Sequence, residues 1–146
     1  MFTGSFRMTE SDIADFVTRF ADAWAHRDGQ RFLDLWHPDG TLHSPLYDRP
    51  VKGSEFGALT ALVAKIAPDQ VWQLIDWTWR PKADGAVVVV EWQSTRVVDG
   101  QRFDWRGTDK LTIRDGKISE EIVYFDSAPL RARRTGQSLE PIVRLP

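Results

Sequence analysis

The chain has 146 residues, of which 42% are hydrophobic and 12% aromatic, and this length and composition fit one folded domain better than two. It contains no cysteine, which excludes disulfides, thiolate catalysis and cysteine-ligated metals. Its 19 basic and 21 acidic side chains give a net charge of -2, which argues against nucleic acid or an anionic membrane as a partner.

Helices are expected in the first half of the chain. A capping-box pattern from Thr9 to Asp12 precedes apolar side chains at helical spacing as far as Trp24. The elements expected after it are a short helix at 30–36, a strand at 41–44 and a third helix that Ser54 is placed to cap and that ends before Pro68.

Strands are expected in the second half. From residue 71 β-branched and aromatic residues dominate, interrupted by Asp-Gly pairs at 84–85, 99–100 and 115–116, which are strong hairpin signals. We predict an antiparallel meander of four strands, with the second at 86–98, the third at 101–114 and the last at 117–126. Because the helices precede the strands, the fold class is α+β, with helices covering one face of a curved sheet that leaves a hollow.

The chain is predicted to divide into a flexible N-terminus at 1–10, the domain at 11–130 and a C-terminal arm at 131–146. The segment from Pro129 onward fits either a short helix or an extended arm. No apolar run is long enough to span a membrane, and the first residues lack the apolar stretch of a signal peptide. We therefore expect a cytoplasmic protein.

One face of the strand at 101–114 is apolar except for a single carboxyl. The side chains on this face are Phe103, Trp105, Gly107, Asp109, Leu111 and Ile113. Burial disfavours the charged form of a carboxyl, so we expect a raised pKa for Asp109. Gly107, on the same face, predicts a bulge or an open space beside that carboxyl.

The turn at 115–116 leaves two registers open for the last strand. A two-residue turn would pair Asp109 with Ile122 and turn to its face Glu120, Tyr124 and Asp126. A three-residue turn with a glycine bulge would pair Asp109 with Glu121, alongside Val123 and Phe125. In the second register two carboxyls meet, one of them stays protonated near neutral pH, and the pair can serve as acid and base.

The order of elements and three segments resemble a known superfamily. The segments RFADAW, TLHSP and GTDKLTIRDGKISEEIVYFD are similar to the nuclear transport factor 2-like superfamily, in particular to its SnoaL-like and ketosteroid-isomerase-like members. The resemblance covers residues 11–130. It implies a cone-shaped α+β barrel, an apolar pocket for a small ring-containing organic molecule, a homodimer, and the register that turns Glu121, Val123 and Phe125 inward.

The resemblance also suggests roles for residues. Asp109 falls where ketosteroid isomerases keep a protonated aspartic acid, whereas Ser44 and Phe20 replace their general-base aspartate and their tyrosine. We expect a cofactor-free isomerase, cyclase, dehydratase or hydrolase that uses Asp109 and Glu121, or alternatively a non-catalytic module for small-molecule binding or dimerisation. The side chains expected to bind substrate are Phe16, Phe20, Trp24, Ser44, Trp105, Val123 and Phe125.

The remaining residues predict an interface but no metal site. The three histidines are scattered, without the spacing of metal ligands, and no nucleotide-binding motif is present. Ile75, Trp77 and Trp79 are predicted to lie on one face of the strand that begins near residue 71. An aromatic patch of this kind is typical of an interface and favours a homodimer.

Overall fold

The structure is a computed structural model that describes residues 7–98 and 100–136. Its helical elements are α1 (Glu10–His26), α2 (Gly29–Leu35), the 3-10 turn η1 (Gly53–Glu55), α3 (Phe56–Ile66) and α4 (Ala128–Thr135). Its strands are β1 (Trp36–His43), β2 (Val51–Lys52), β3 (Val71–Lys82), β4 (Gly85–Val98), β5 (Gln101–Arg114) and β6 (Lys117–Phe125). In this part of the chain no helix has the length and apolar character needed to cross a membrane.

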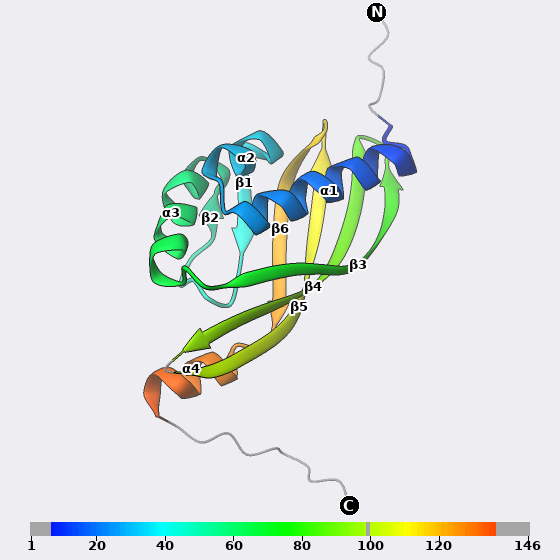
Figure 1. Cartoon of the computed structure of the whole chain (residues 1–146). Helices are drawn as coiled ribbons and strands as arrows, with labels where there is room; N and C mark the ends of the chain where they lie inside the picture. The colour runs from blue at the N-terminus through cyan, green and yellow to red at the C-terminus, as the bar shows by residue number, and fades with distance from the viewer. Residues whose placement is uncertain (1–6, 99, 137–146) are drawn as a thin grey trace, which may run out of the picture.

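The fold is of the expected α+β class. Within the described residues the strands form one sheet in the order β2-β1-β6-β5-β4-β3, antiparallel except where β1 runs parallel to β6. Helix α1 lies across one face of this sheet, α2 and α3 lie beside its β1 end, and α4 lies near the far ends of β4 and β5 (Figure 1). We call the face beneath α1 the inner face. Residues 128–135 form the short helix of the two expected alternatives.

The capping box expected for the first helix is confirmed. Thr9 Oγ1 accepts a hydrogen bond from the Asp12 amide at 3.2 Å, and Asp12 Oδ2 accepts one from the Thr9 amide at 2.8 Å. The side chains that α1 buries in the core are Ile13, Phe16, Val17, Phe20 and Ala23. Their helical spacing gives α1 one apolar stripe, and this stripe packs on the inner face of the sheet.

Two expected boundaries in the first half were wrong. Helix α2 ends at Leu35, and the strand already begins at Trp36, because Trp36 pairs with Ile118 while its ring is buried to 1% exposure. The register of β1 shifts between Trp36 and Thr41. A strand can contain a proline at an irregularity of this kind. Ser54 caps no helix but lies within η1.

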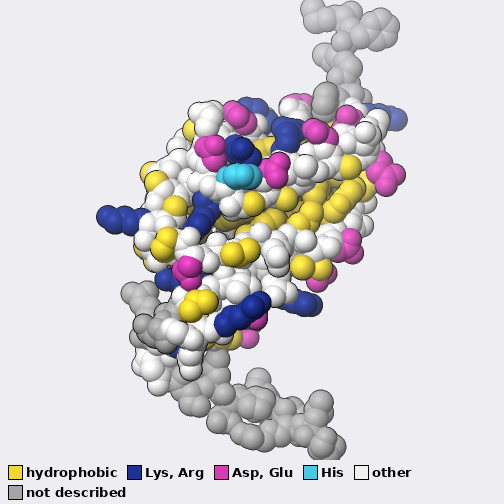
Figure 2. All heavy atoms as spheres, in the orientation of Figure 1, with side chains coloured by type: hydrophobic (Ala, Val, Ile, Leu, Met, Phe, Trp, Pro, Cys, Tyr) yellow, Lys and Arg dark blue, Asp and Glu magenta, His cyan; other side chains and the backbone are white. Residues whose placement is uncertain are grey.

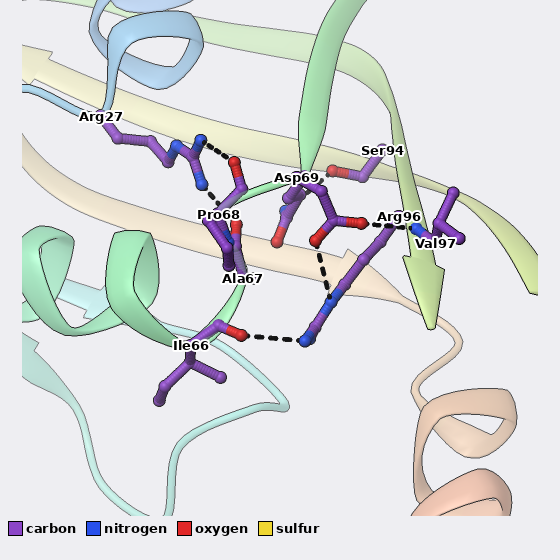
Figure 3. Close-up of polar contacts among 9 residues, drawn as sticks. Arg27, Ile66, Ala67, Pro68, Asp69, Ser94, Arg96 and Val97 are labelled. Atoms are coloured by element: carbon purple, nitrogen blue, oxygen red, sulfur yellow. Dashed lines mark hydrogen bonds and ion pairs between the residues drawn. The ribbon is translucent and has the colours of Figure 1, made fainter. Parts of the chain in front are cut away.

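Two arginines from distant elements fix the junction between α3 and β3 (Figure 3). Arg27 donates hydrogen bonds to the carbonyls of Ala67 and Pro68, and Arg96 donates one to the carbonyl of Ile66 at 2.9 Å. Carbonyls at a helix C-terminus lack helical donors, so the guanidinium groups satisfy them. The contacts tie the start of β3 to α1 and β4.

The inner face has two halves, which we name by their burial. The closed half consists of fully buried aliphatic side chains: Ala86, Val88, Leu111, Ile113 and Ile118. The open half, toward the far ends of β4 and β5, carries rings and polar groups, many of them only half-buried: Trp72, Trp92, Ser94, Trp105, Asp109, Glu121, Val123 and Phe125. The candidate site lies in the open half.

The predicted aromatic patch on β3 was wrong in its geometry. A bulge between Leu74 and Asp76 separates Ile75, which is 46% exposed, from the two tryptophans that follow. Trp77 and Trp79 are half-buried and pack against the core. Figure 2 shows apolar side chains along the strip between α1 and β3, where β3 borders the helix layer. These tryptophans thus belong to the inner face, opposite to the face on which Ile75 is exposed.

Candidate functional site

The register between β5 and β6 decides which side chains surround Asp109. Asp115 and Gly116 form a two-residue turn with φ of 50° and 79°, so Arg114 pairs with Lys117. Positive φ at both turn residues is typical of the tight hairpin turns that Asp-Gly favours.

A bulge then shifts the register by one residue. Ile113 pairs with Ile118, but Thr112 pairs with Glu120, so Ser119 is the extra residue, and its hydroxyl donates a hydrogen bond to the Thr112 carbonyl at 3.1 Å. Neither expected register was right, because the structure combines a two-residue turn with a bulge.

The resulting ladder places both carboxyls on the inner face. Asp109 pairs with Val123, and Leu111 pairs with Glu121, so the two acids are diagonal neighbours. Diagonal neighbours across two strands are within reach of longer side chains. The prediction that Glu121, Val123 and Phe125 face inward with Asp109 agrees with this ladder.

Asp109 is buried, and none of the ion pairs among the described residues involves it. Its side chain is 2% exposed, and its Oδ1 accepts a hydrogen bond from the indole nitrogen of Trp92 at 2.8 Å. Burial raises the pKa of Asp109 to about 6, although the neighbouring Glu121 carboxyl and the hydrogen bond from Trp92 act in the opposite direction. The carboxyl therefore changes its charge close to neutral pH.

Glu121 is the more deeply buried of the two acids. It has 0% exposure, and neither of its oxygens has a hydrogen-bond partner of normal geometry among the described residues. Burial raises its pKa well above the usual value; the charge and the proximity of the Asp109 carboxyl raise it further, and the nearby indole of Trp36 lowers it. Both acids thus hold their protons to a higher pH than exposed carboxyls do, and the charge of one opposes the ionisation of the other.

The open space expected beside Gly107 is occupied. Gly107 lies opposite Trp92 in the β4–β5 ladder, and a Cβ at this position would come within 2.5 Å of the Trp92 ring and 2.9 Å of Phe125 Cβ. The expectation of a void there was wrong, because the glycine makes room for the indole ring. This close packing lets the indole nitrogen reach Asp109.

Aromatic rings line the open half as a continuous series. The ring centroids of Trp24 and Trp72 are 6.3 Å apart, those of Trp72 and Trp92 are 6.5 Å apart, and those of Trp92 and Phe125 are 5.8 Å apart. Pairs at such distances attract each other beyond their burial of apolar area. The series runs from α1 across β3 and β4 to β6, and it supplies flat apolar surface beside the carboxyl pair.

Tyr47 is a site residue that sequence reasoning missed. It lies in the loop after β1, is half-buried, and packs against the core. Burial and the charge of Glu121 both raise the pKa of its phenol, so the hydroxyl keeps its proton. The one available signal was an aromatic residue between the expected strand at 41–44 and the expected third helix.

A groove opens next to the carboxyl pair. β1 ends at His43, which pairs with Ile122, so within the described chain the last residues of β6 have a strand partner only in β5. The groove in this notch has a volume of about 630 Å³ and is lined by His43, Ser44, Pro45, Ile122, Val123, Tyr124 and Phe125. Val123, one of the residues that line the groove, is the direct partner of Asp109 in the β5–β6 ladder.

A second groove of about 360 Å³ lies on the other side of Pro45. It is lined by Pro45, Leu46, Tyr47, Asp48, Ser127, Leu130 and Arg131. The loop after β1 therefore separates two openings, and its Tyr47 is the residue that lines the second one and also acts on Glu121. Arg131 of α4 donates a hydrogen bond to the Pro45 carbonyl at 3.3 Å and joins this loop to α4.

The other predicted substrate-binding residues lie at different depths. Phe16 and Phe20 are fully buried in the core, whereas Trp24 and Trp105 are half-buried. Ser44 accepts a hydrogen bond from the Leu46 amide at 3.2 Å, so its hydroxyl stabilises the loop at the groove. In residues 7–98 and 100–136 no group of three or more histidine, aspartate or glutamate side chains is placed to hold a metal ion.

Solved structures with a similar backbone arrangement show the class to which this fold belongs. AclR from Streptomyces galilaeus, assigned as a hydroxylase, matches with a TM-score of 0.67 at 20% identity, over 92% of this chain and 87% of that chain. A protein from Jannaschia sp. CCS1, assigned as a SnoaL-like polyketide cyclase, matches with a TM-score of 0.67 at 20% identity, over 84% and 91%. TerC, co-crystallised with polyporic acid, matches with a TM-score of 0.67 at 17% identity, over 82% and 95%. At these identities the likeness shows a common fold.

The sequence assigns the family within that class. The family of the SnoaL-like domain matches residues 17–121, and the chain belongs to this family of the nuclear transport factor 2-like superfamily. Among curated proteins, none matches the sequence. The matched range contains Asp109 and ends at Glu121, so both carboxyls fall within the part that defines the family.

Proposed function

We propose that this protein binds a small, ring-containing apolar organic molecule in the open half and acts on it by cofactor-free acid/base chemistry. The observation that carries the proposal is that two carboxyls, Asp109 and Glu121, are buried as diagonal neighbours in the half of the inner face that carries the aromatic rings. Apolar sites with a few convergent polar groups and perturbed pKa values are typical of enzymes that use acid/base catalysis.

The carboxyl pair can take up and release a proton in the order that acid/base catalysis requires. Asp109, charged above about pH 6, takes a proton from one atom of the ligand, and the pair then holds two protons. The pair returns one of these protons to another atom of the ligand through Asp109. The number of protons on the pair is unchanged after one cycle, as isomerisation, cyclisation or dehydration requires, and no cofactor takes part.

The notch groove supplies the route to the pair. It is lined by Ser44, Val123 and Phe125, three of the residues expected to bind substrate, while Trp24 and Trp105 extend the apolar surface. TerC, a structure of the same fold, was co-crystallised with the organic compound polyporic acid, which supports a small organic ligand for this chain. Stacking on rings favours a flat ligand.

One observation favours a second candidate, a non-catalytic binding module. Both carboxyls are almost completely buried, at 2% and 0% exposure, and the residues that line the notch groove include neither of them. A ligand that stayed in the groove would contact Val123 without reaching Asp109. The two candidates therefore differ in whether the ligand touches the acid.

The test compares Asp109→Asn with Asp104→Asn, a control that removes an exposed acid from the opposite face of the same strand. We expect wild type to turn over at least one member of a panel of polyketide, steroid, terpene-epoxide and aromatic compounds. Loss of one positioned acid or base lowers turnover by roughly 10²- to 10⁴-fold, so Asp109→Asn loses activity and Asp104→Asn keeps it. Equal activity in both variants contradicts the catalytic proposal. Ligand-dependent thermal stabilisation without any turnover supports the binding module.

We also propose a homodimer, formed through the outer face of the sheet. The exposed apolar side chains on this face are Val71, Ile75, Val97 and Tyr124, each at least 46% exposed. Exposed apolar side chains that gather on one face are typical of interfaces. Sedimentation equilibrium of wild type should give the dimer mass, and Tyr124→Asp should give the monomer mass; a monomeric wild type contradicts the proposal.

A further inference from the structure

The contact between Trp92 and Asp109 is the best-defined polar contact of the site. The indole nitrogen donates to Asp109 Oδ1 at 2.8 Å, with Trp92 at 5% and Asp109 at 2% exposure. An indole N–H is a donor only, so it bonds an ionised carboxyl well without neutralising its charge. A buried donor of this kind stabilises the charged form of the acid it contacts.

The packing around Trp92 fixes its ring in this position. Gly107 lies directly opposite, and any side chain there would collide with the ring. Trp72 on one side and Phe125 on the other hold the ring at centroid distances of 6.5 Å and 5.8 Å. The indole therefore has no room to turn away from Asp109.

Other groups around the pair leave the two acids unequal. Val90, the partner of Asp109 on β4, carries no charge, and neither do the other fully buried side chains that α1 and β4 turn to the inner face, among them Phe16, Phe20 and Val88. Glu121 comes from β6, Tyr47 from the loop after β1, and Trp36 from β1. The Trp36 nitrogen makes no hydrogen bond of normal geometry. Asp109 thus has an aligned neutral donor, and Glu121 has none.

We propose that Trp92 is a positioning residue that assigns the two roles within the carboxyl pair. Its N–H keeps the negative charge on Asp109, which therefore acts as the base, and leaves the proton on Glu121, which acts as the acid. The contact also holds one oxygen of Asp109 and leaves the other to Glu121 and the ligand. This inference rests on the proposed acid/base function, which it deepens by naming the residue that sets the direction of proton transfer.

The test is a carbon-13 carboxyl NMR titration of the free protein, with Trp92→Phe as the variant and Trp79→Phe, on the same face of the sheet but paired with Val88, as the control. Both variants keep a ring and lose an indole, but only the first loses a hydrogen bond to the acid. Since such a bond to a charged group corresponds to about one pH unit, the lower midpoint of the pair rises by that amount in Trp92→Phe and is unchanged in Trp79→Phe. An unchanged midpoint in Trp92→Phe overturns the assignment.

A second measurement needs no folded Trp92 variant. In wild type, the indole N–H resonance of Trp92 in proton–nitrogen spectra should shift with the same midpoint as the Asp109 carboxyl, and Asp109→Asn should abolish this step. A resonance without a pH-dependent step overturns the assignment.

Activity separates this inference from the proposed function. In Trp92→Phe the acid limb of the kcat/KM profile moves upward in pH, whereas a purely structural loss lowers activity equally at all pH values. An acid limb that stays in place while activity falls overturns the positioning role. No turnover in wild type, together with the expected titration shift, overturns the acid/base function and leaves the assignment of the proton in place.

Discussion

The two halves of the inner face are built on the same strands and differ in almost every other respect. In the closed half, β4 and β5 present Val88 and Leu111 to α1, and both are fully buried. In the open half the same strands present Trp92 and Asp109 to a series of half-buried rings. The closed half holds the fold together by apolar burial, whereas the open half contains an acid pair whose burial opposes its ionisation.

The difference between the two halves is clearest for one pair of residues that face each other across β5 and β6. Leu111 and Glu121 are direct partners across β5 and β6, and both have 0% exposure. Burial stabilises the folded state at Leu111 and costs free energy at Glu121, because the carboxyl must keep a proton that water would remove at pH 7. Two adjacent buried residues can thus have opposite effects on the free energy of unfolding. The residue whose burial is unfavourable is the candidate for a functional role.

The largest effect is expected from a cavity in the closed half. Leu111→Ala should lower the free energy of unfolding by about 3 kcal/mol, within the range for leucine in a packed core. Phe125→Ala removes more atoms from the open half, yet it should cost less than half as much because Phe125 is only half-buried. Denaturant unfolding of both variants measures this difference. Equal losses would show that the two halves are packed alike.

Removal of the buried acid that pairs with Leu111 should stabilise the protein. Glu121→Gln should raise the free energy of unfolding at pH 7, since the raised pKa of Glu121 means that its burial costs free energy at this pH. The exposed neighbour Glu120 gives the control Glu120→Gln, which should change stability by less than about 0.5 kcal/mol. A destabilised Glu121→Gln would show that Glu121 is held as an anion.

The acid pair should also make wild type less stable as the pH rises. A carboxyl whose pKa is higher in the folded than in the unfolded state binds its proton more tightly when folded, so its contribution is lost as the pH rises from the unfolded pKa toward the folded one. For Asp109 this window runs from the usual aspartate pKa of 3.8 to about 6. Across this pH window the free energy of unfolding of wild type should fall by about 2 kcal/mol, and that of Asp109→Asn should fall by less. Denaturant midpoints at pH 4, 5, 6 and 7 measure the slope, and identical slopes would contradict the raised pKa.

The smallest effect is expected far from the site. Thr9→Ala removes the capping box of α1 and should cost about 1 kcal/mol of stability. Ser11→Ala, an exposed change within the same helical turn, is the matched control and should be close to neutral. Neither change should move the titration of Asp109, because the cap lies outside the open half. A shifted titration in Thr9→Ala would show that the two halves are coupled through α1.

Sequence patterns predicted much of the fold and the identity of the acid pair. Alternation along β5 placed Asp109 on an apolar face, and the Asp-Gly turn at 115–116 formed as expected. The bulge at Ser119 was not predicted, because two turn types were compatible with the same residues. The bulge at Ile75 likewise changed which side chains share a face with Trp77 and Trp79. A one-residue irregularity turns every later side chain to the other face, so alternation alone fails at such points.

The sequence by itself determined the α+β class, the capped first helix, the inward face of β5 and the carboxyl that breaks it, since each depends on periodicity within one segment. Only the tertiary structure decided that Trp92 fills the space at Gly107, that Trp92 bonds Asp109, and that Tyr47 lies near Glu121. These contacts join residues from different elements, and their geometry depends on register, bulges and packing that no single segment encodes.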